Sequence, residues 1–248
     1  MADPFFAPLI RRWEQRSALS KEDCDAIAAL PHSRRTVERD TYLVRDGDVP
    51  KNCHLLVTGF AYRHKVVANG SRQILSIHMP GEFVDLENLM LDLADHNVQA
   101  LNRAEIAAIP RAALQALARR HQALGRAMWL DTLVDASIHR EWVVNVGRRD
   151  AMSRVAHLIC ELAIRMKAAG LAGDNRFDLP LTQEQIADCA GLTAVHVNRV
   201  LRGLRDEGLI RLNLRSLHIL DWDGLCTVGD FNRRYLHPDL QQGAAADG

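Results

Sequence analysis

Hydrogen-bond donors recur at helical spacing in the segment from Leu181 to Leu220. Arg199 and Arg202 are three residues apart, so a helix would present both toward one side, with Asn198 flanking them. The apolar residues of the same segment follow the opposite face: Val197, Val200, Leu201 and Leu204. A guanidinium can bond O6 and N7 of guanine together, and a carboxamide can bond N6 and N7 of adenine. The pattern predicts a helix that reads base edges in the major groove.

Capping signals predict the elements that position this helix. Thr182 precedes Gln185 by three residues, which is the spacing of a capping box at a helix start. Gly191 tolerates the left-handed backbone of a tight turn, and Thr193 is suited to cap the second helix. Two short helices joined by a glycine turn are the arrangement of a helix-turn-helix, whose second helix enters the major groove.

The segment after this helix alternates apolar and polar residues from Leu209 to Leu220, in two runs around Asn213 to Ser216. Such alternation predicts a β-hairpin, which would be the wing of a winged helix-turn-helix. The stretch 190–220 holds five arginines and two acidic residues, although the whole chain balances 31 basic against 31 acidic residues. The alternative is that these arginines are only the solvated face of an amphipathic helix. The coincidence of cap, turn, apolar spacing and wing favours DNA binding.

The first half of the chain has the pattern of a small β domain. Between Arg34 and Pro110 short apolar runs alternate with turn signals, which predicts about eight strands in an antiparallel barrel or jelly roll. Asn69-Gly70 predicts a two-residue type I′ turn that joins Tyr62–Val67 to Gln73–His78, because both central residues of that turn need positive φ.

Residues 121–147 predict one long helix with two apolar faces. The first face contains Leu124, Ala127, Met128, Val134, Ile138, Trp142 and Val146, and the second contains Leu130, Leu133 and Val144. One face can cover the β domain, and the other is expected to pack against the same helix of a second subunit. An aspartate at Ile138 is expected to break that dimer. A helix buried between two domains of one chain is the alternative.

Six segments resemble the Crp–Fnr family of bacterial transcription regulators. They are Leu181–Thr193, Asn198–Leu201, Leu204–Ile210, Val44–Asp48, Leu56–Gly59 and Met79–Phe83. The resemblance implies an α+β chain with three parts: a cyclic-nucleotide-binding-like antiparallel β jelly roll (1–120), a dimerisation helix (121–147) and a winged helix-turn-helix domain (148–248). It also implies a homodimer that binds a palindromic promoter site in double-stranded DNA, with RNA polymerase as a further partner.

The resemblance also implies which residues contact DNA. Arg199 matches the family's base-reading arginine, and Thr182 and Gln183 match phosphate-contacting positions. Val195 stands where many members carry glutamate, so this position is expected to make an apolar contact, for instance with a thymine methyl group. The full predicted set is Thr182, Gln183, Thr193, Val195, His196, Asn198, Arg199 and Arg202.

The sensor half departs from the family's known chemistry, and its effector stays unidentified. Cyclic-nucleotide binders of the family carry Arg-Ser after their Gly-Glu, whereas Asp85–Asn97 holds four acidic residues and no arginine. Cyclic AMP is therefore not expected to bind. The five cysteines, at 24, 53, 160, 189 and 226, fit no disulfide framework, zinc site or iron–sulfur site and are expected to be reduced and mostly buried. No cofactor is expected. The alternative is haem held by one of the sensor histidines, which are His32, His54, His64, His78 and His96.

Several function classes do not fit the chain. No run approaches the roughly 20 apolar residues of a membrane span, and Met1–Arg12 is too short for a signal peptide, so a cytoplasmic protein is expected. No arrangement of nucleophile, base and acid suggests an enzyme. The rival from another class is a cupin-like jelly-roll metalloenzyme. However, His54, His64 and His78 are 10 and 14 residues apart and lack the close histidine pair of such sites.

Overall fold

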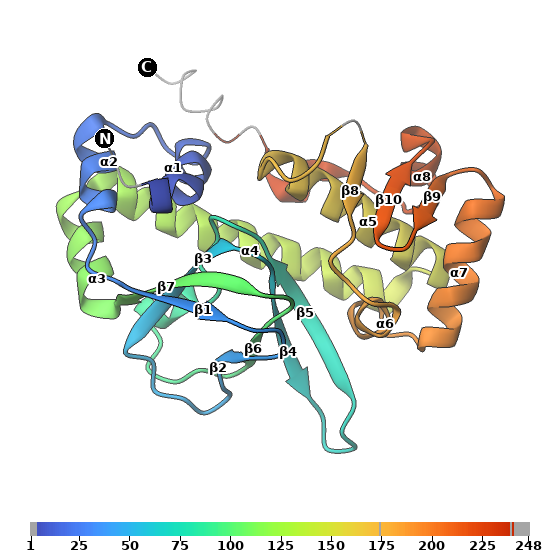
Figure 1. Cartoon of the computed structure of the whole chain (residues 1–248), viewed down its shortest axis with the longest axis horizontal. Helices are drawn as coiled ribbons and strands as arrows, with labels where there is room; N and C mark the ends of the chain where they lie inside the picture. Colours follow the sequence, from blue (N-terminus) through green and yellow to red (C-terminus); the bar gives the residue numbers. More distant parts are fainter. Residues whose placement is uncertain (1–3, 174, 239, 241–248) are drawn as a thin grey trace. The chain divides into compact units, whose positions relative to one another are not determined.

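The computed structural model describes residues 4–173, 175–238 and 240 (Figure 1). The chain forms two compact units. The N-terminal unit contains the chain up to Lys65, Ser76–Ser137 and the described residues from Leu236 on, and the C-terminal unit contains Val66–Leu75 and Ile138–Tyr235. The long helix α4 (Gln122–Arg148) occupies the segment where the sequence predicts a helix, and it contributes its first half to one unit and its second half to the other. The outer ends of the predicted domains, 1–3 and 241–248, lie outside the described residues.

Seven strands of the first 110 residues form two antiparallel sheets, where the sequence predicted about eight strands. One sheet has the order β1-β7-β3, and the other has the order β2-β6-β4-β5. The strands are β1 (Ser33–Val37), β2 (Tyr42–Val44), β3 (Asn52–Thr58), β4 (Ala61–Val66), β5 (Arg72–His78), β6 (Asn97–Ala100) and β7 (Ala104–Pro110). The predicted fold class, with N-terminal antiparallel sheets, a long helix and a C-terminal helix-turn-helix, is confirmed.

The hairpin between β4 and β5 has a different turn from the one predicted. Gly70 has φ +85°, but Asn69 does not have a positive φ, so the turn is not of type I′. The amide of Gly70 instead donates to Val67 O at 2.8 Å, and the amide of Val67 donates to Ser71 O at 3.0 Å. The bond from Gly70 to Val67 closes a four-residue turn, and Gly70 is its last residue, in the left-handed region. This combination is typical of a longer hairpin loop with a bulge.

Short helices before, between and after the strands complete the core of the β domain. They are η1 (Pro4–Phe6), α1 (Ala7–Glu14), α2 (Lys21–Ala28), η2 (Leu86–Leu89) and α3 (Arg111–Arg120). Trp13 and Leu9 of α1 are fully buried in one cluster with Leu55 of β3 and Met128 of α4. Neither α1 nor α2 is predicted from the sequence, because each is only eight residues long and has few apolar positions.

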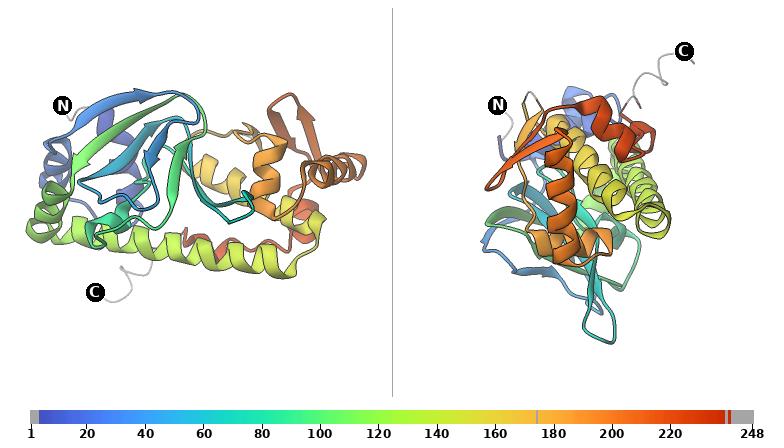
Figure 2. Two further views of the ribbon diagram at one scale, coloured as in Figure 1. Left: turned by 90° about the horizontal axis from the view of Figure 1, so that it is seen from below. Right: turned by 90° about the vertical axis from the view of Figure 1, so that its right-hand side faces the viewer.

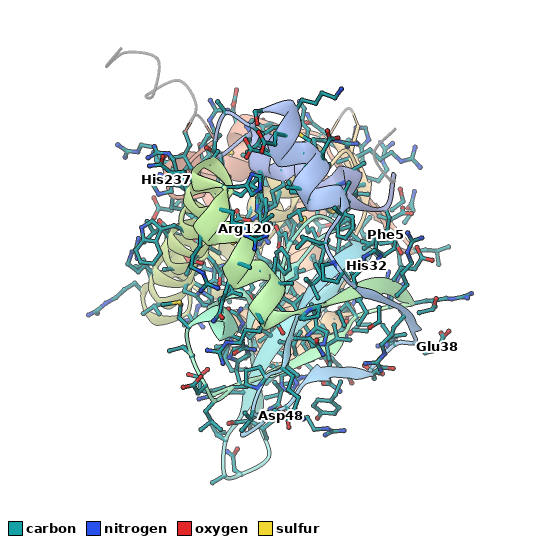
Figure 3. All side chains as sticks on the ribbon, turned by 90° about the vertical axis from the view of Figure 1, so that its left-hand side faces the viewer. Phe5, His32, Glu38, Asp48, Arg120 and His237 are labelled. Carbon is teal, nitrogen blue, oxygen red and sulfur yellow. The ribbon has the colours of Figure 1, made fainter. Side chains whose placement is uncertain are left out.

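The side chain of Phe5 ties η1 to the segment that leads into β1. Its ring stacks on the imidazole of His32 with centroids 5.3 Å apart, and the Arg34 guanidinium lies 4.0 Å from its centroid. Figure 3 shows Phe5 and His32 next to each other. His32, one of the histidines considered for haem, therefore has a packing role.

The C-terminal unit consists of helices around a three-stranded sheet of order β8-β10-β9 (Figure 2). Its elements are α5 (Ala151–Ala168), β8 (Arg176–Asp178), α6 (Gln183–Ala190), α7 (Ala194–Asp206), β9 (Ile210–Asn213), β10 (Ser216–Ile219), α8 (Trp222–Val228) and η3 (Arg233–Leu236). The predicted wing is the β9–β10 hairpin. Strand β8 was not predicted, since it has three residues and exists only by pairing with β10.

A buried carboxylate organises this unit. Glu161 of α5 is fully buried and accepts hydrogen bonds from the Trp142 indole at 3.0 Å and the Tyr235 hydroxyl at 2.8 Å. Arg165 pairs with its other oxygen at 3.0 Å. A buried charge that is paired and hydrogen-bonded is tolerated, whereas one that loses a partner is costly. Glu161 thereby connects α5 to the second half of α4 and to η3.

The two predicted apolar faces of α4 differ in how far the chain buries them. Six residues of the first face are buried: Leu124, Ala127, Met128, Val134, Ile138 and Trp142. On the second face, Leu133 is 45% exposed and Val144 is 44% exposed. Ile138 therefore belongs to the face buried within the chain, so an aspartate there would also disturb the packing of the single chain and is no clean test of the dimer. Among the described helices, none is long and apolar enough to cross a membrane.

Candidate nucleic-acid interface

The first helix of the motif, α6, begins with the predicted capping box. The Gln185 amide donates to the Thr182 hydroxyl at 3.2 Å, and the Gln185 side-chain carbonyl accepts from the Thr182 amide at 2.9 Å. Gln185 is buried while Gln183, in the first turn, is exposed. The reciprocal bonds satisfy two amides that a helix start would otherwise leave unpaired. This cap sets where α6 begins and turns Gln183 toward solvent.

A glycine turn and a second cap set the start of α7. Gly191 ends α6 in the left-handed conformation, with φ +63° and ψ +41°. The Leu192 amide then bonds back to Ala187 O at 3.0 Å, and the Thr193 hydroxyl accepts from the His196 amide at 3.3 Å. A residue with a Cβ would be strained at position 191. The turn therefore directs α7 away from α6 at the point that the sequence predicted.

Helix α7 has one buried and one exposed face. Val197, Leu201 and Leu204 are buried. Helix α7 packs against α5 and α6. The residues predicted to contact DNA lie on the other side: Val195 is 70% exposed, and His196, Asn198, Arg199 and Arg202 are exposed as well. Thr193 is also exposed, and Thr182 of α6 is half-buried. The structure thus brings all eight predicted residues to the exposed sides of α6 and α7.

Two of these residues connect the helices on the exposed side. The Asn198 side-chain amide donates to the Gln183 side-chain carbonyl at 3.3 Å. The contact joins the start of α6 to the first half of α7 and leaves donors and acceptors of both side chains available. Polar groups of the two helices therefore lie at one surface.

The arginines of α7 have no acidic partner in the described part of the chain. Arg199 and Arg202 are both exposed and form no ion pair there. On the wing, Arg211 and Arg215 are exposed in the same way. An exposed guanidinium without an internal acceptor has five donors available to an outside phosphate or base. This arrangement is suited to binding a polyanion.

A second cluster of charged groups lies in the sensor half, around Arg63 of β4. This guanidinium is buried and donates to Glu87 at 2.9 Å, to Asp135 of α4 at 2.9 Å and to Val84 O at 3.0 Å. The acidic stretch 85–97 contains no arginine of its own. The fold supplies one from a strand that precedes the stretch by more than 20 residues, and no local signal in the sequence indicates it.

The hollow beside Arg63 is small. Its volume is about 30 Å³, and it is lined by Arg12, Arg63, His78, Glu82, Phe83, Leu86, Glu87, Asp131, Thr132 and Asp135. A cavity of this size has room for about one or two water molecules, whereas sites for organic ligands measure roughly 300–1,000 Å³. The side chains of the chain itself occupy this part of the sensor.

Burial and neighbouring charges shift the titration of this cluster. Burial raises the pKa of Glu87 to about 7, helped by the nearby carboxylates of Asp85 and Asp135 and opposed by Arg63. Burial also lowers the pKa of His96, whose Nε2 lies 3.2 Å from Glu87. His96 Nε2 forms no hydrogen bond in the described part of the structure, so Glu87 and His96 are close ionisable neighbours and not a hydrogen-bonded pair. Glu87 is therefore a carboxyl group of the sensor half that titrates near neutral pH.

Two of the remaining sensor histidines, His54 and His78, bond to groups of the protein, and the third, His64, is buried with its ring 5.3 Å from that of Tyr62. His54 bonds Asp85 at 2.7 Å, and His78 lies 3.0 Å from the Ser76 hydroxyl. Burial lowers the pKa of His54, but Asp85 outweighs it, so this pKa is raised; the pKa of His78 is lowered by burial. In the described residues, no group of three or more His, Cys, Asp or Glu side chains is arranged to hold a metal ion.

The cysteines are reduced, and three of the five are buried. Cys53, Cys160 and Cys189 are buried, while Cys24 and Cys226 are partly exposed. The sequence separates Cys160 and Cys226 by 66 residues, yet their sulfur atoms lie 3.9 Å apart between α5 and α8. Burial raises the pKa of both thiols, so thiolate is scarce at neutral pH.

Two family models match separate parts of the chain. The model described as cyclic nucleotide-binding domain matches residues 34–121, and the model described as Crp-like helix-turn-helix domain matches residues 153–228. The first range coincides with the β domain and α3, and the second runs from the start of α5 to the end of α8.

Relatives with the same layout span most of the chain. The transcriptional activator protein FnrA of Stutzerimonas stutzeri is 25% identical over 85% of this chain and 86% of its own length. A probable transcriptional activator of Rhizobium leguminosarum bv. viciae is 29% identical over 77% of this chain and 79% of its own. The structure of FixK2 from Bradyrhizobium japonicum shares the fold, with a TM-score of 0.74 at 24% identity over 80% of this chain and 98% of that one.

Proposed function

This chain belongs to the Crp–Fnr family of bacterial transcription regulators, and from that premise we propose that it acts as a homodimer on a palindromic promoter site. That it is a DNA-binding transcription regulator follows from the family. We propose in addition which residues read DNA, which face of the chain forms the subunit interface and which partners bind. A regulator of bacterial promoters acts in the cytoplasm together with RNA polymerase, which is the further partner we propose.

The observation that carries the DNA-reading proposal is the exposed, donor-rich face of α7. In this proposal Arg199 reads guanine, Asn198 reads adenine and Val195 contacts a thymine methyl group. The polar groups at the helix starts and flanks position the protein on the backbone: Thr182, Gln183, Thr193, His196 and Arg202. All eight side chains lie on α6, on α7 or at the N-caps of these helices, so in this proposal a single duplex contacts them together.

The test is DNA binding by Arg199→Ala. Wild-type protein selects its site from a random duplex library, and affinity for that duplex is then measured by fluorescence anisotropy at fixed salt. Loss of a bidentate guanine contact costs about 1–3 kcal/mol per half-site. Arg120→Ala, which removes an exposed arginine of α3, serves as the matched control and should bind as the wild type does. Equal affinity of Arg199→Ala and wild type would refute the placement of the reading helix.

The homodimer proposal rests on the exposed face of α4. Trp129, Leu133, Ala136 and Val143 follow the alternating four- and three-residue spacing of a coiled-coil seam, with Arg140 at the remaining position. Trp129 is 64% exposed and also lines a groove of about 650 Å³. Large apolar side chains in a row on one helix are suited to the same row of a second copy.

Leu133→Asp tests this interface. The side chain is 45% exposed in the single chain, so the substitution spares the core but places two carboxylates against each other in the proposed dimer. Sedimentation should show a monomer that retains helical content and binds the selected duplex weakly. Val49→Asp, at another exposed valine, is the control and should stay dimeric. A Leu133→Asp protein that sediments as the wild type does would exclude α4 as the seam.

A further inference from the structure

Two cysteines outside the proposed DNA-binding face lie against each other in the C-terminal unit. Cys160 of α5 and Cys226 of α8 are 66 residues apart in sequence, and their sulfur atoms lie 3.9 Å apart. Cys160 is fully buried, whereas Cys226 is partly exposed. Cys24 and Cys53 belong to the N-terminal unit, and Cys189 lies on α6. The fold thus brings one accessible thiol next to one buried thiol.

The backbones of α5 and α8 approach closely beside this pair. A Cβ at Gly229, the C-cap of α8, would lie 2.8 Å from the backbone nitrogen of His157, so only glycine permits the approach. The His157 ring Nδ1 donates to Gly229 O at 3.1 Å, which fixes the register of the two helices. His157 precedes Cys160 by three residues and Gly229 follows Cys226 by three, so the helices run in opposite directions and the thiols meet about one turn away.

The distance between the sulfur atoms suits the formation of a covalent bond. A disulfide needs its two sulfur atoms about 2 Å apart. Starting from 3.9 Å, each sulfur atom has to move by about 1 Å, which is within the reach of a rotation about its Cα–Cβ bond. The pair can therefore be bridged while the register of α5 and α8 is kept.

We propose that Cys160 and Cys226 form a site of oxidative modification, at which hydrogen peroxide closes a disulfide between α5 and α8. Cys226, the accessible thiol, reacts first. Its thiolate sulfur bonds to one peroxide oxygen, the O–O bond breaks, and the other oxygen takes up a proton and leaves as water, which produces a sulfenic acid. The Cys160 sulfur then attacks the Cys226 sulfur, the S–O bond breaks, and the hydroxyl leaves as water with the Cys160 proton. The two thiols lose two electrons and two protons, and the peroxide is reduced to two water molecules.

The disulfide closes a loop that contains the whole helix-turn-helix motif. Residues 161–225 include β8, α6, α7, β9 and β10. Joining the ends of a loop restricts the unfolded chain, and the resulting stabilisation grows with loop length. Neither α5 nor α8 supplies any of the eight residues proposed to contact DNA. Oxidation therefore stabilises the motif and leaves its DNA-facing side unchanged.

Mass spectrometry and calorimetry of the full chain test this site. Reduced wild-type protein is treated with hydrogen peroxide, and its remaining thiols are then alkylated. The mass before alkylation should fall by about 2 Da, and digestion should yield a cross-linked peptide that contains Cys160 and Cys226. The melting temperature of the C-terminal unit should rise by about 10 °C, and dithiothreitol should reverse the rise. Cys226→Ser should show neither change, whereas Cys24→Ser, which removes the other partly exposed cysteine, should show both.

The order of the two steps can be tested separately. Burial and the nearby Asp223 raise the pKa of the Cys226 thiol, opposed by its hydrogen bond with Cys160. Since the thiolate is the attacking species, the disulfide should form slowly at neutral pH and about tenfold faster per unit of pH as the pH rises to about 8.5. In Cys160→Ala the sulfenic acid of Cys226 should accumulate and be trapped by dimedone. A sulfenic acid trapped at position 160 in Cys226→Ser, with none at 226 in Cys160→Ala, would overturn this order.

Two results would overturn the proposal as a whole. One is peroxide-treated wild-type protein in which Cys226 is a sulfinic acid and the cross-linked peptide is missing. The other is a disulfide that leaves the melting temperature unchanged or lowers it. A third measurement uses DNA: between the two melting temperatures, only the oxidised protein should bind the selected duplex. This last measurement rests on the proposed function, whereas the mass and the melting temperature do not, so a failure of that function is distinguishable.

Discussion

Arg63 in the N-terminal unit and Arg199 in the C-terminal unit have the same side chain and opposite surroundings. Arg63 is buried and gives its donors to Glu87, Asp135 and a backbone carbonyl. Arg199 is exposed and has no ion pair in the described chain. The difference teaches that an arginine can serve an outside anion only where the fold has placed no acceptor of its own. The same guanidinium stabilises one unit and is available to a partner in the other.

Arg63→Ala should have the largest effect of the predicted changes. It leaves the partly buried carboxylates of Glu87 and Asp135 without their counter-ion and removes a guanidinium that is itself buried. Breaking a fully buried pair costs about 3–5 kcal/mol of unfolding free energy, so we expect a loss of about 3 kcal/mol here. Urea denaturation followed by circular dichroism measures the loss. Arg199→Ala should unfold within about 0.5 kcal/mol of wild type in the same assay.

The control for this comparison is Arg103→Ala. Arg103 is exposed and pairs with Glu38 at 3.5 Å on the surface of the same unit, so its removal should cost at most about 1 kcal/mol. If Arg63→Ala proved as mild as Arg103→Ala, the buried cluster would not stabilise the sensor and the contrast between the two units would disappear.

The pH dependence of stability should reveal Glu87. Its pKa of about 7 in the folded chain lies above the ordinary value of 4.5, so the folded state holds this proton more tightly than the unfolded state does. Its stabilising contribution is complete below pH 4.5, decreases as the pH rises and is lost above about pH 7. Glu87→Gln mimics the protonated form. The free energy of unfolding of this variant should therefore fall by about 1–2 kcal/mol less than that of wild type between pH 5 and 7.5.

The charged groups that face Glu87 define the control for that experiment. They are Arg63 of β4, Asp135 of α4, and Asp85 and His96 from the loops on either side. His96→Gln, which removes the only imidazole among them, should keep most of the slope between pH 5 and 7.5. A slope lost in His96→Gln and kept in Glu87→Gln would assign the titration to the histidine.

Cyclic AMP should have the smallest effect. Arg63 is the buried guanidinium of the sensor half, and its donors already face internal carboxylates beside a cavity of about 30 Å³. Millimolar cyclic AMP should leave both the melting temperature and the affinity for the selected duplex unchanged. A ligand at 100 times its dissociation constant would add about 2.7 kcal/mol, which thermal denaturation detects readily. A clear rise in the melting temperature would mean that the N-terminal unit, like the C-terminal one, has cationic groups available to an outside anion.

Local signals in the amino-acid sequence determine the DNA-binding motif. Thr182 with Gln185, Gly191 and Thr193 each act on backbone groups within about five residues, so their spacing alone predicts where α6 begins and ends and where α7 begins. The 3.6-residue period of α7 likewise separates its buried from its exposed side chains. The turn at Gly70 was placed correctly by the same reasoning but assigned the wrong type, because φ of Asn69 depends on the register of β4 and β5.

Other features depended on contacts between distant segments, which no local pattern encodes. Arg63 meets Glu87 and Asp135 from positions 24 and 72 residues away, and the sulfur atoms of Cys160 and Cys226 meet across 66. The sequence determined which faces of the helices are apolar. Only the tertiary structure decided which of those faces the chain buries and which arginine has donors available to a partner. The reason is that burial and ion pairing depend on distance in space.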